Sequence, residues 1–159
     1  MRLPKPRHLA LAVALAAAVG CASSPQAPSA ASPAPAAAPV AAAVDVGEVV
    51  VRIVADTMRS LTRPTDCLGR YGGEEFLFVL MDTGGDGACV YAERIRAHIE
   101  QRGHILSERF PGHPLTASIG IAVFADGYED QARLVAAADA ALYRAKASGR
   151  TRIEVARGG

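Results

Sequence analysis

The chain has 159 residues, with 17 lysines and arginines against 16 aspartates and glutamates, so it is nearly neutral and long enough for one domain. It shows no clustered basic face, has no tryptophan and contains only 4 tyrosines and 4 phenylalanines, which argues against nucleic-acid binding through a basic patch or stacked aromatic side chains. The charge is uneven, because the first 43 residues carry three basic residues and no acidic residue.

The first 21 residues have the pattern of a bacterial export signal. A basic start precedes an unbroken apolar run at residues 9–19, which is too short to span a bilayer comfortably. Cys21 follows the small residue Gly20, and this order resembles a lipobox, in which the cysteine is lipidated and becomes the new N-terminus. A signal cleaved elsewhere and an uncleaved anchor are the alternatives. The basic residues are Arg2, Lys5 and Arg7.

In all of these versions the basic end stays inside and the following chain crosses the membrane, so we expect an exported, membrane-anchored protein. Residues 22–43 are low in complexity, with 11 alanines, 5 prolines and 4 serines. Such a segment cannot form a core and is interrupted by proline, so it is predicted to be a disordered or semi-extended tether. The folded part then occupies residues 44–159, enough for a modest core.

Apolar residues recur at three- and four-residue spacing over residues 46–61, which predicts an amphipathic helix that ends before Pro64. Two short apolar runs follow at 67–71 and 76–81, separated by a glycine pair, and they predict a β-hairpin with a tight turn. Cys67 is expected to be buried in the first of these strands.

A second helix is predicted from about residue 88, close to Cys89, and is expected to stop near Gly103. Residues 115–124 predict a strand, in which Gly120 indicates a bulge or a close approach. A third helix closed by Gly149 and a short strand at 151–155 complete the chain. Helices that alternate with strands and a hairpin predict an α/β sandwich, with helices over a mixed sheet.

The hairpin turn carries the residues with most chemical potential. Glu74 and Glu75 are adjacent carboxylates that repel each other, so they are either solvated or neutralised by a cation. Oxygen ligands favour a hard cation such as magnesium. Gly72 and Gly73 leave room for a phosphate or a sugar against the backbone. For this short pattern alone, an ordinary solvated hairpin tip is the alternative.

The longer string at residues 70–76, Arg-Tyr-Gly-Gly-Glu-Glu-Phe, resembles the signature loop of GGDEF domains, the diguanylate cyclases. Residues 117–122 resemble the family's strand after its second helix, and residues 137–150 its C-terminal helix and turn. The resemblance implies a nucleotidyl cyclase-like, ferredoxin-type sandwich with a mainly antiparallel sheet. It also implies that Glu74 and Glu75 hold magnesium. The catalytic loop implied in this way is Gly72, Gly73, Glu74, Glu75 and Phe76.

Two further pairs gain a role from the resemblance. Lys146 and Arg150 are four residues apart, which predicts a shared helix face, and in the family these positions contact the phosphates of GTP. The alternative is two solvated charges favoured by the helix dipole. Arg63 and Asp66 form the family's Arg-x-x-Asp inhibitory site for cyclic di-GMP at the family's offset from the glycine pair. A surface turn with a local ion pair is the alternative here.

The resemblance breaks before the first predicted helix. Glu48 takes the place of a guanine-binding aspartate, and the guanine-binding asparagine falls on Pro39. The family's first strand, which is central and carries a metal-binding aspartate, has no counterpart because the tether at 22–43 occupies its place. We therefore expect a sheet that lacks this strand.

Two functions remain open. The first is a homodimeric enzyme that condenses two GTP molecules to cyclic di-GMP and two pyrophosphates, weakened or inactivated by the missing segment. The second is a non-catalytic module on an exported lipoprotein, binding cyclic di-GMP or a protein partner. The missing metal carboxylate favours the second, and so does the leader, because GTP is cytosolic.

Overall fold

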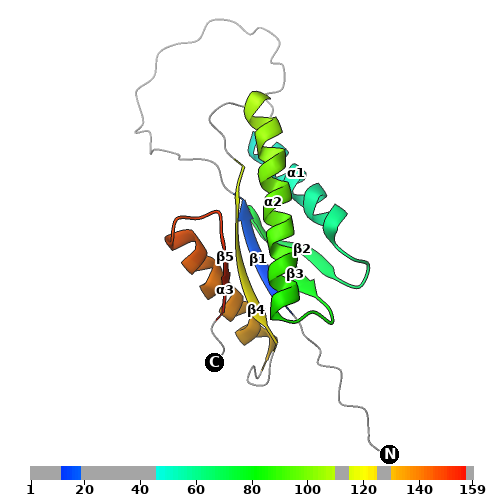
Figure 1. The fold of residues 1–159 in the computed structure, drawn as a ribbon, viewed down its shortest axis with the longest axis vertical. Helices are drawn as coiled ribbons and strands as arrows, with labels where there is room; N and C mark the ends of the chain where they lie inside the picture. Colours follow the sequence, from blue (N-terminus) through cyan, green and yellow to red (C-terminus); the bar gives the residue numbers. More distant parts are fainter. Residues whose placement is uncertain (1–11, 19–45, 110–114, 125–129, 157–159) are drawn as a thin grey trace, which may run out of the picture.

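The computed structural model describes residues 12–18, 46–109, 115–124 and 130–156. Within these ranges, one five-stranded sheet has the order β2-β3-β1-β4-β5, and three helices pack against it (Figure 1). All neighbouring strands are antiparallel except β4 and β5, so the expected mixed, mainly antiparallel α/β sandwich is confirmed. The strands are β1 (Ala12–Ala18), β2 (Cys67–Gly72), β3 (Glu75–Leu80), β4 (Ala117–Val123) and β5 (Ile153–Val155). The helices are α1 (Val46–Leu61), α2 (Gly85–Arg109) and α3 (Gln131–Ala147).

The helices cover opposite faces of the sheet. Alternation along β3 separates the two cores, since Phe76, Phe78 and Leu80 are buried with residues of α1 and α2, whereas Leu77 and Val79 pack on the side of α3. Figure 1 shows the same layering, with α1 and α2 together and α3 across the sheet from them. The α1 and α2 side holds the larger core, which includes Val54, Met58, Ile95, Ile99, Ile119 and Ile121.

Strand β1 corrects the expectation that the sheet lacks a first strand. Ala12–Ala18 lie between β3 and β4 and pair with both of them. These residues belong to the apolar run that the sequence predicted as the core of an export signal. An unbroken apolar run is compatible with an export signal and also with a central strand, because strands covered on both faces have nearly continuous apolar sequences. The tether at 22–43 lies outside the described residues.

The other predicted elements are present with close bounds, apart from one helix end. Helix α2 continues to Arg109 instead of stopping near Gly103. Gly103 is buried, and a Cβ atom there would lie 2.7 Å from the carbonyl oxygen of Leu115. The glycine therefore allows close packing inside the helix. Cys67 was expected to be buried and is exposed, because β2 is an edge strand.

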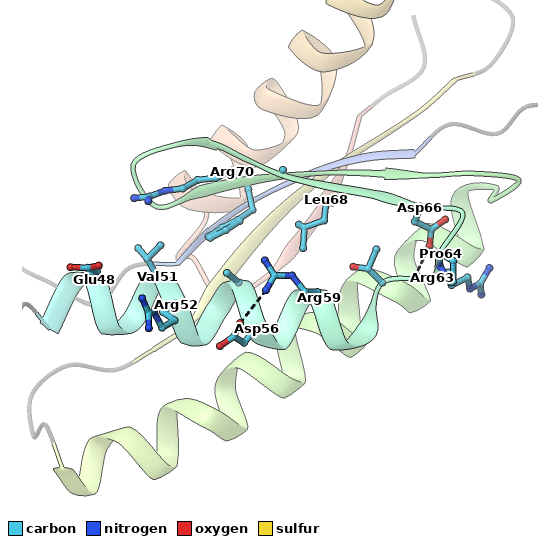
Figure 2. A pocket seen from close by; sticks show the side chains of 14 residues that line it. Glu48, Val51, Arg52, Asp56, Arg59, Arg63, Pro64, Asp66, Leu68 and Arg70 are labelled. Atoms are coloured by element: carbon cyan, nitrogen blue, oxygen red, sulfur yellow. Dashed lines mark hydrogen bonds and ion pairs between the residues drawn. The ribbon is translucent and has the colours of Figure 1, made fainter.

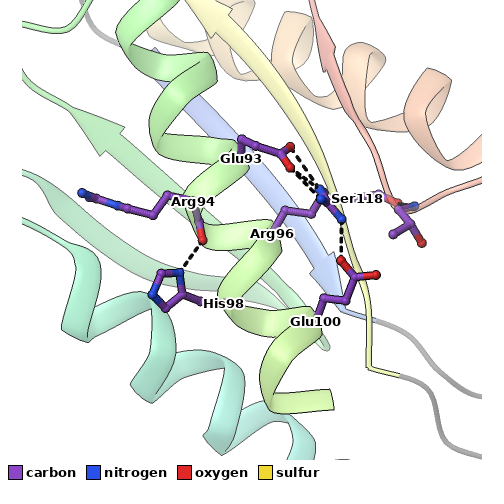
Figure 3. A network of polar contacts seen from close by, with 7 residues as sticks. Glu93, Arg94, Arg96, His98, Glu100 and Ser118 are labelled. Atoms are coloured by element: carbon purple, nitrogen blue, oxygen red, sulfur yellow. Dashed lines mark hydrogen bonds and ion pairs between the residues drawn. The ribbon is translucent and has the colours of Figure 1, made fainter. Parts of the chain in front are cut away.

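Arg96 is the centre of a polar network on α2, shown in Figure 3. Its guanidinium donates to Glu93 at 2.6 Å and to Glu100 at 2.9 Å. The hydrogen bond from Arg96 holds the pKa of Glu93 below its usual value. Arg96 is only 19% exposed, so this clamp is better shielded from water than an ordinary surface ion pair.

Gly120 fixes the distance between α3 and the sheet. A Cβ atom at this position would lie 2.2 Å from both the carbonyl oxygen of Ala138 and the backbone nitrogen of Leu142. These are backbone atoms, which cannot rotate away. The close approach predicted from the sequence is therefore confirmed, and it brings the middle of α3 onto β4.

We expect Gly120→Ala to lower the free energy of unfolding by about 3 kcal/mol, because α3 must move off the sheet to admit a methyl group. Gly69→Ala is the matched control, since nothing lies within 4 Å of a Cβ atom at that position of β2. Urea unfolding of both variants measures the difference. Equal stability of the two would contradict the close packing.

Candidate nucleotide site at the hairpin tip

The hairpin turn has the geometry predicted from its glycine pair. Gly72 ends β2 and Glu75 begins β3, so Gly73 and Glu74 form the turn. Gly73 has a positive φ of 41°, a conformation that glycine adopts without strain. Its carbonyl accepts a hydrogen bond of 2.8 Å from Nε of Arg70, which braces the turn from the preceding strand. Phe76, the last residue of the loop motif, is buried in the core and anchors the hairpin.

Lys146 joins the carboxylate pair from a distant part of the chain. Its Nζ lies 3.0 Å from Oε1 of Glu75, and both side chains are 33% exposed. Desolvation raises the pKa of the Glu74 carboxyl above its usual value; the Lys146 charge acts in the opposite direction, and the Glu75 charge adds to the rise. The fold thus places a cation against two acidic residues where α3 meets β3.

Arg150 does not share a helix face with Lys146, contrary to expectation, because α3 ends at Ala147. It lies in a turn of three consecutive residues with positive φ: Gly149 at 105°, Arg150 at 61° and Thr151 at 49°. Three hydrogen bonds hold this turn: from the N–H of Arg150 to the carbonyl of Ala145, from Thr151 N–H to the Ser118 hydroxyl, and from Ile119 N–H to the carbonyl of Arg152. Arg150 itself is exposed.

The carboxylate pair gains no acidic neighbour from the adjacent strand. In the register of β1 and β3, Glu75 is opposite Ala17, and no residue of β1 is acidic. Within the described ranges, no group of three or more histidine, cysteine, aspartate or glutamate residues is placed to hold a metal ion. Within the described residues, Glu74 and Glu75 thus offer carboxylate oxygens, the ligand type that magnesium prefers, without a third acidic residue, histidine or cysteine placed beside them.

A groove of about 830 Å³ runs between α1 and the β2–β3 hairpin (Figure 2). Glu48 lies at one end of it, in the first turn of α1, and is exposed. Arg63 and Asp66 lie at the other end, where α1 leads into β2. Phe76 also lines the groove. Glu48 and the Arg63–Asp66 turn thus share one groove, although the sequence assigned them to separate sites.

Asp66 has a structural task in this turn. One carboxylate oxygen accepts from the N–H of Met81 at 3.1 Å and the other from the N–H of Arg63 at 3.4 Å. The N–H of Asp66 in turn donates to the carbonyl of Arg63 at 3.0 Å. The turn is therefore fixed to the end of β3. Arg63 is exposed, so its guanidinium is accessible to a ligand.

Arg94 is a second arginine near this turn that the sequence analysis missed. It comes from α2, donates to the Leu61 carbonyl at 3.2 Å and lies over the ring of Tyr91 at 5.3 Å. The Tyr91 hydroxyl contacts Thr62 at 3.1 Å. Burial raises the pKa of Tyr91; the nearby charges of Asp66, Arg94 and Arg63 act on it as well. Arg63, Asp66 and Tyr91 also line a smaller cavity of about 200 Å³.

The predicted lipidation site, Cys21, lies outside the described residues, so export and lipidation stay predictions. No helix in the described ranges combines the length and apolar character needed to cross a membrane.

A fold of this kind, with a glycine-acid hairpin tip facing a lysine on the C-terminal helix, is that of a nucleotidyl cyclase-type domain. Comparison with protein families gives a match to the GGDEF domain of diguanylate cyclases over residues 44–152. The chain therefore belongs to the GGDEF family.

Curated relatives agree with this assignment. Diguanylate cyclase A of Treponema denticola is 36% identical over 113 residues, which cover 70% of this chain and 29% of that protein. Diguanylate cyclase DgcP of Pseudomonas aeruginosa is 40% identical over 112 residues, covering 69% of this chain and 16% of that protein. The chain thus spans less than a third of the length of these relatives.

Solved structures share the fold. The active GGEEF domain of a diguanylate cyclase from Vibrio cholerae superposes with a TM-score of 0.67 at 21% identity, covering 95% of this chain and 85% of that one. The GGDEF domain of DgcB from Caulobacter crescentus, in complex with c-di-GMP, has a TM-score of 0.66 at 24% identity, covering 92% of this chain and 78% of that one.

The geometry predicts the effect of Lys146 on its neighbours. Lys146→Met should raise the pKa of Glu74 further, because the substitution removes the cation that favours the ionised carboxylate. Titration of the Glu74 carboxyl carbon by NMR measures the shift. Arg102→Met, on α2 across the sheet, is the control and should leave this pKa unchanged. An unchanged pKa of Glu74 in Lys146→Met would show that the lysine does not act on it, and a lower pKa would contradict the expected direction.

Proposed function

We propose that this domain binds guanine nucleotides at the hairpin tip as a diguanylate cyclase-type domain, with weak or no cyclase activity. The observation that carries the proposal is the meeting of Glu74 and Glu75 with Lys146, across 71 residues of sequence, beside a β1 strand without a carboxylate. The family assignment supplies the reaction class, and the residues of this chain set its efficiency.

The reaction joins two GTP molecules. The 3′-oxygen of each attacks the α-phosphorus of the other, so two P–O bonds form, two bonds to the β-phosphate oxygens break and two pyrophosphates leave. The two hydroxyl protons pass to a base or to water. Because each subunit of this class brings one GTP, a homodimer is required. Gly72 and Gly73 leave the backbone open to the nucleotide.

The charged residues at the hairpin tip would bind the phosphates, accept the hydroxyl proton and hold magnesium. Lys146 would exchange its contact with Glu75 for the phosphates, with Arg150 as a second phosphate ligand from the left-handed turn. Glu74, whose carboxyl has a raised pKa, suits the role of accepting the 3′-hydroxyl proton. Magnesium, held by Glu74 and Glu75 together with the phosphates, would neutralise the charge on the triphosphate.

Two features argue for low activity. Strand β1 places Ala17 opposite Glu75 and has no acidic residue that could serve as a further metal ligand. On the guanine side, Glu48 takes the place of the family's aspartate and is exposed at one end of the groove. Each lost contact of this kind costs a few kcal/mol of transition-state stabilisation, or about 10²-fold or more in rate.

The full chain incubated with GTP and magnesium should therefore give very little cyclic di-GMP. Glu74→Ala should remove whatever synthesis remains, because it deletes both a metal ligand and the proposed proton acceptor. Chromatographic detection of cyclic di-GMP measures both. Robust synthesis that disappears in Glu74→Ala would contradict the weak-activity part of the proposal and keep the site assignment.

A second function, binding of cyclic di-GMP without catalysis, is favoured by the turn at Arg63. Asp66 is held by two backbone N–H groups, and Arg94 reaches the same region from α2. A planar guanidinium can donate two parallel hydrogen bonds to a phosphate or a guanine edge. This turn does not involve the hairpin tip, so it can bind even where catalysis fails.

Cyclic di-GMP should bind to the full chain, and both Arg63→Ala and Arg63→Lys should weaken it. We expect a loss of about 1.5–3 kcal/mol, because lysine does not reproduce the fork of arginine. Calorimetry measures the affinity, and Arg102→Lys serves as a control on the same face of the sheet. If lysine at position 63 preserved the affinity, the fork geometry would not be needed.

A further inference from the structure

The apolar run at residues 9–19 has two incompatible uses. It has the composition and basic start of an export signal, and its residues 12–18 form the central strand of the sheet. A cleavage before Cys21 would fall just after the end of β1 at Ala18 and would remove the whole strand. One molecule therefore cannot be both cleaved at that point and folded with β1 in place.

The rest of the sheet depends on β1. It pairs with β3 from Ala12↔Leu80 to Ala17↔Glu75, and with β4 from Ala12↔Val123 to Ala18↔Ala117. Without β1, strands β3 and β4 would be separated by about 9–10 Å, twice the spacing of adjacent strands. Both would then present unpaired backbone groups, which is costly inside a domain and promotes aggregation at an edge.

The hydrophobic core crosses the same gap. The largest core cluster combines Phe76 and Phe78 of β3 with Ile119 and Ile121 of β4, which lie on opposite sides of β1. Helices also contact β1 from both faces, α1 and α2 from one and α3 from the other. Figure 1 shows β1 in the middle of the domain. Removal of β1 would open the core along its centre.

We propose that folding and cleaved export are mutually exclusive fates of this chain: the folded domain needs residues 12–18 as its central strand, and a chain cleaved before Cys21 cannot form this sheet. The folded form then stays on the side of the membrane where the chain is made. GTP is available on that side, so the folded domain and the nucleotide it is proposed to bind are in the same compartment, although the leader resembles an export signal.

The sequence separation of β1 and β4 indicates what decides between folding and export. The β4 partners of β1 lie about 100 residues further along the chain, and ribosomes add about 5–20 residues per second. For roughly 5–20 s the apolar run is thus available to the export machinery before β4 exists. Once β4 has formed, residues 12–18 of the run lie between two strands of the sheet. The outcome is a competition between capture of the run and completion of the sheet.

Hydrogen exchange on the intact full chain tests the first half of the proposal. The backbone amides of 12–18 should be protected as strongly as those of β3 and β4, because all three strands open together. Leu15→Pro should lower the melting temperature by more than about 10 °C, since proline in a central strand breaks the ladder. The control is Ala30→Pro in the proline-rich tether, which should change it little. Unprotected amides at 12–18 beside protected β3 and β4 would overturn the proposal.

Fractionation tests the second half. The full chain is expressed in a bacterium that processes lipoproteins, and each fraction is treated with protease before its intact mass is measured. The protease-resistant material should always include residues 12–18, because these lie between two strands of the sheet, and any chain that begins at Cys21 should be digested. A protease-resistant chain that begins at Cys21, with the melting temperature of the full chain, would overturn the proposal.

Discussion

The pairing of β1 with two neighbours is the constraint on which the other contacts depend. A strand inside a sheet uses the N–H and C=O groups of both its edges, so β1 holds the β2–β3 hairpin to the β4–β5 pair. The core under α1 and α2 draws side chains from both halves and is continuous only while the halves are held at this distance. The hairpin tip owes its position opposite α3 to the same pairing.

The site follows from this arrangement. Gly120 lets α3 lie directly on β4, and the end of α3 then reaches Glu75, two strands away from β4. On the neighbouring strand, the register of β1 and β3 places Ala17 beside Glu75. The fold thus brings a cation to the carboxylate pair, whereas the neighbouring strand β1 brings no acidic residue.

Much of the fold was predictable because the signals were local. The stripe of α1 and the glycine pair of the hairpin each report a conformation within a few residues of sequence. Strand β1 was not predictable, since an alanine-rich apolar run has no periodicity to separate a central strand from a signal sequence. Gly103 resembled a helix end because its partner, Leu115, is distant in sequence. In the site, Glu74 and Lys146 could be selected from family motifs in the sequence. Arg94 could not, because only the fold brings it to Leu61 and Tyr91, near the Arg63–Asp66 turn.

The turn after α3 contains two residues with side chains in a backbone conformation that costs energy. Arg150 and Thr151 both adopt positive φ, which is uncommon for any residue with a side chain and rarest for a β-branched one. Each such residue costs on the order of 1–3 kcal/mol, which the three hydrogen bonds of the turn offset. Glycine at position 151 would relieve that cost and make the domain more stable. It would keep the three hydrogen bonds but widen the range of backbone conformations open to the turn, so the chain accepts a lower stability in return for a more narrowly fixed backbone at Arg150.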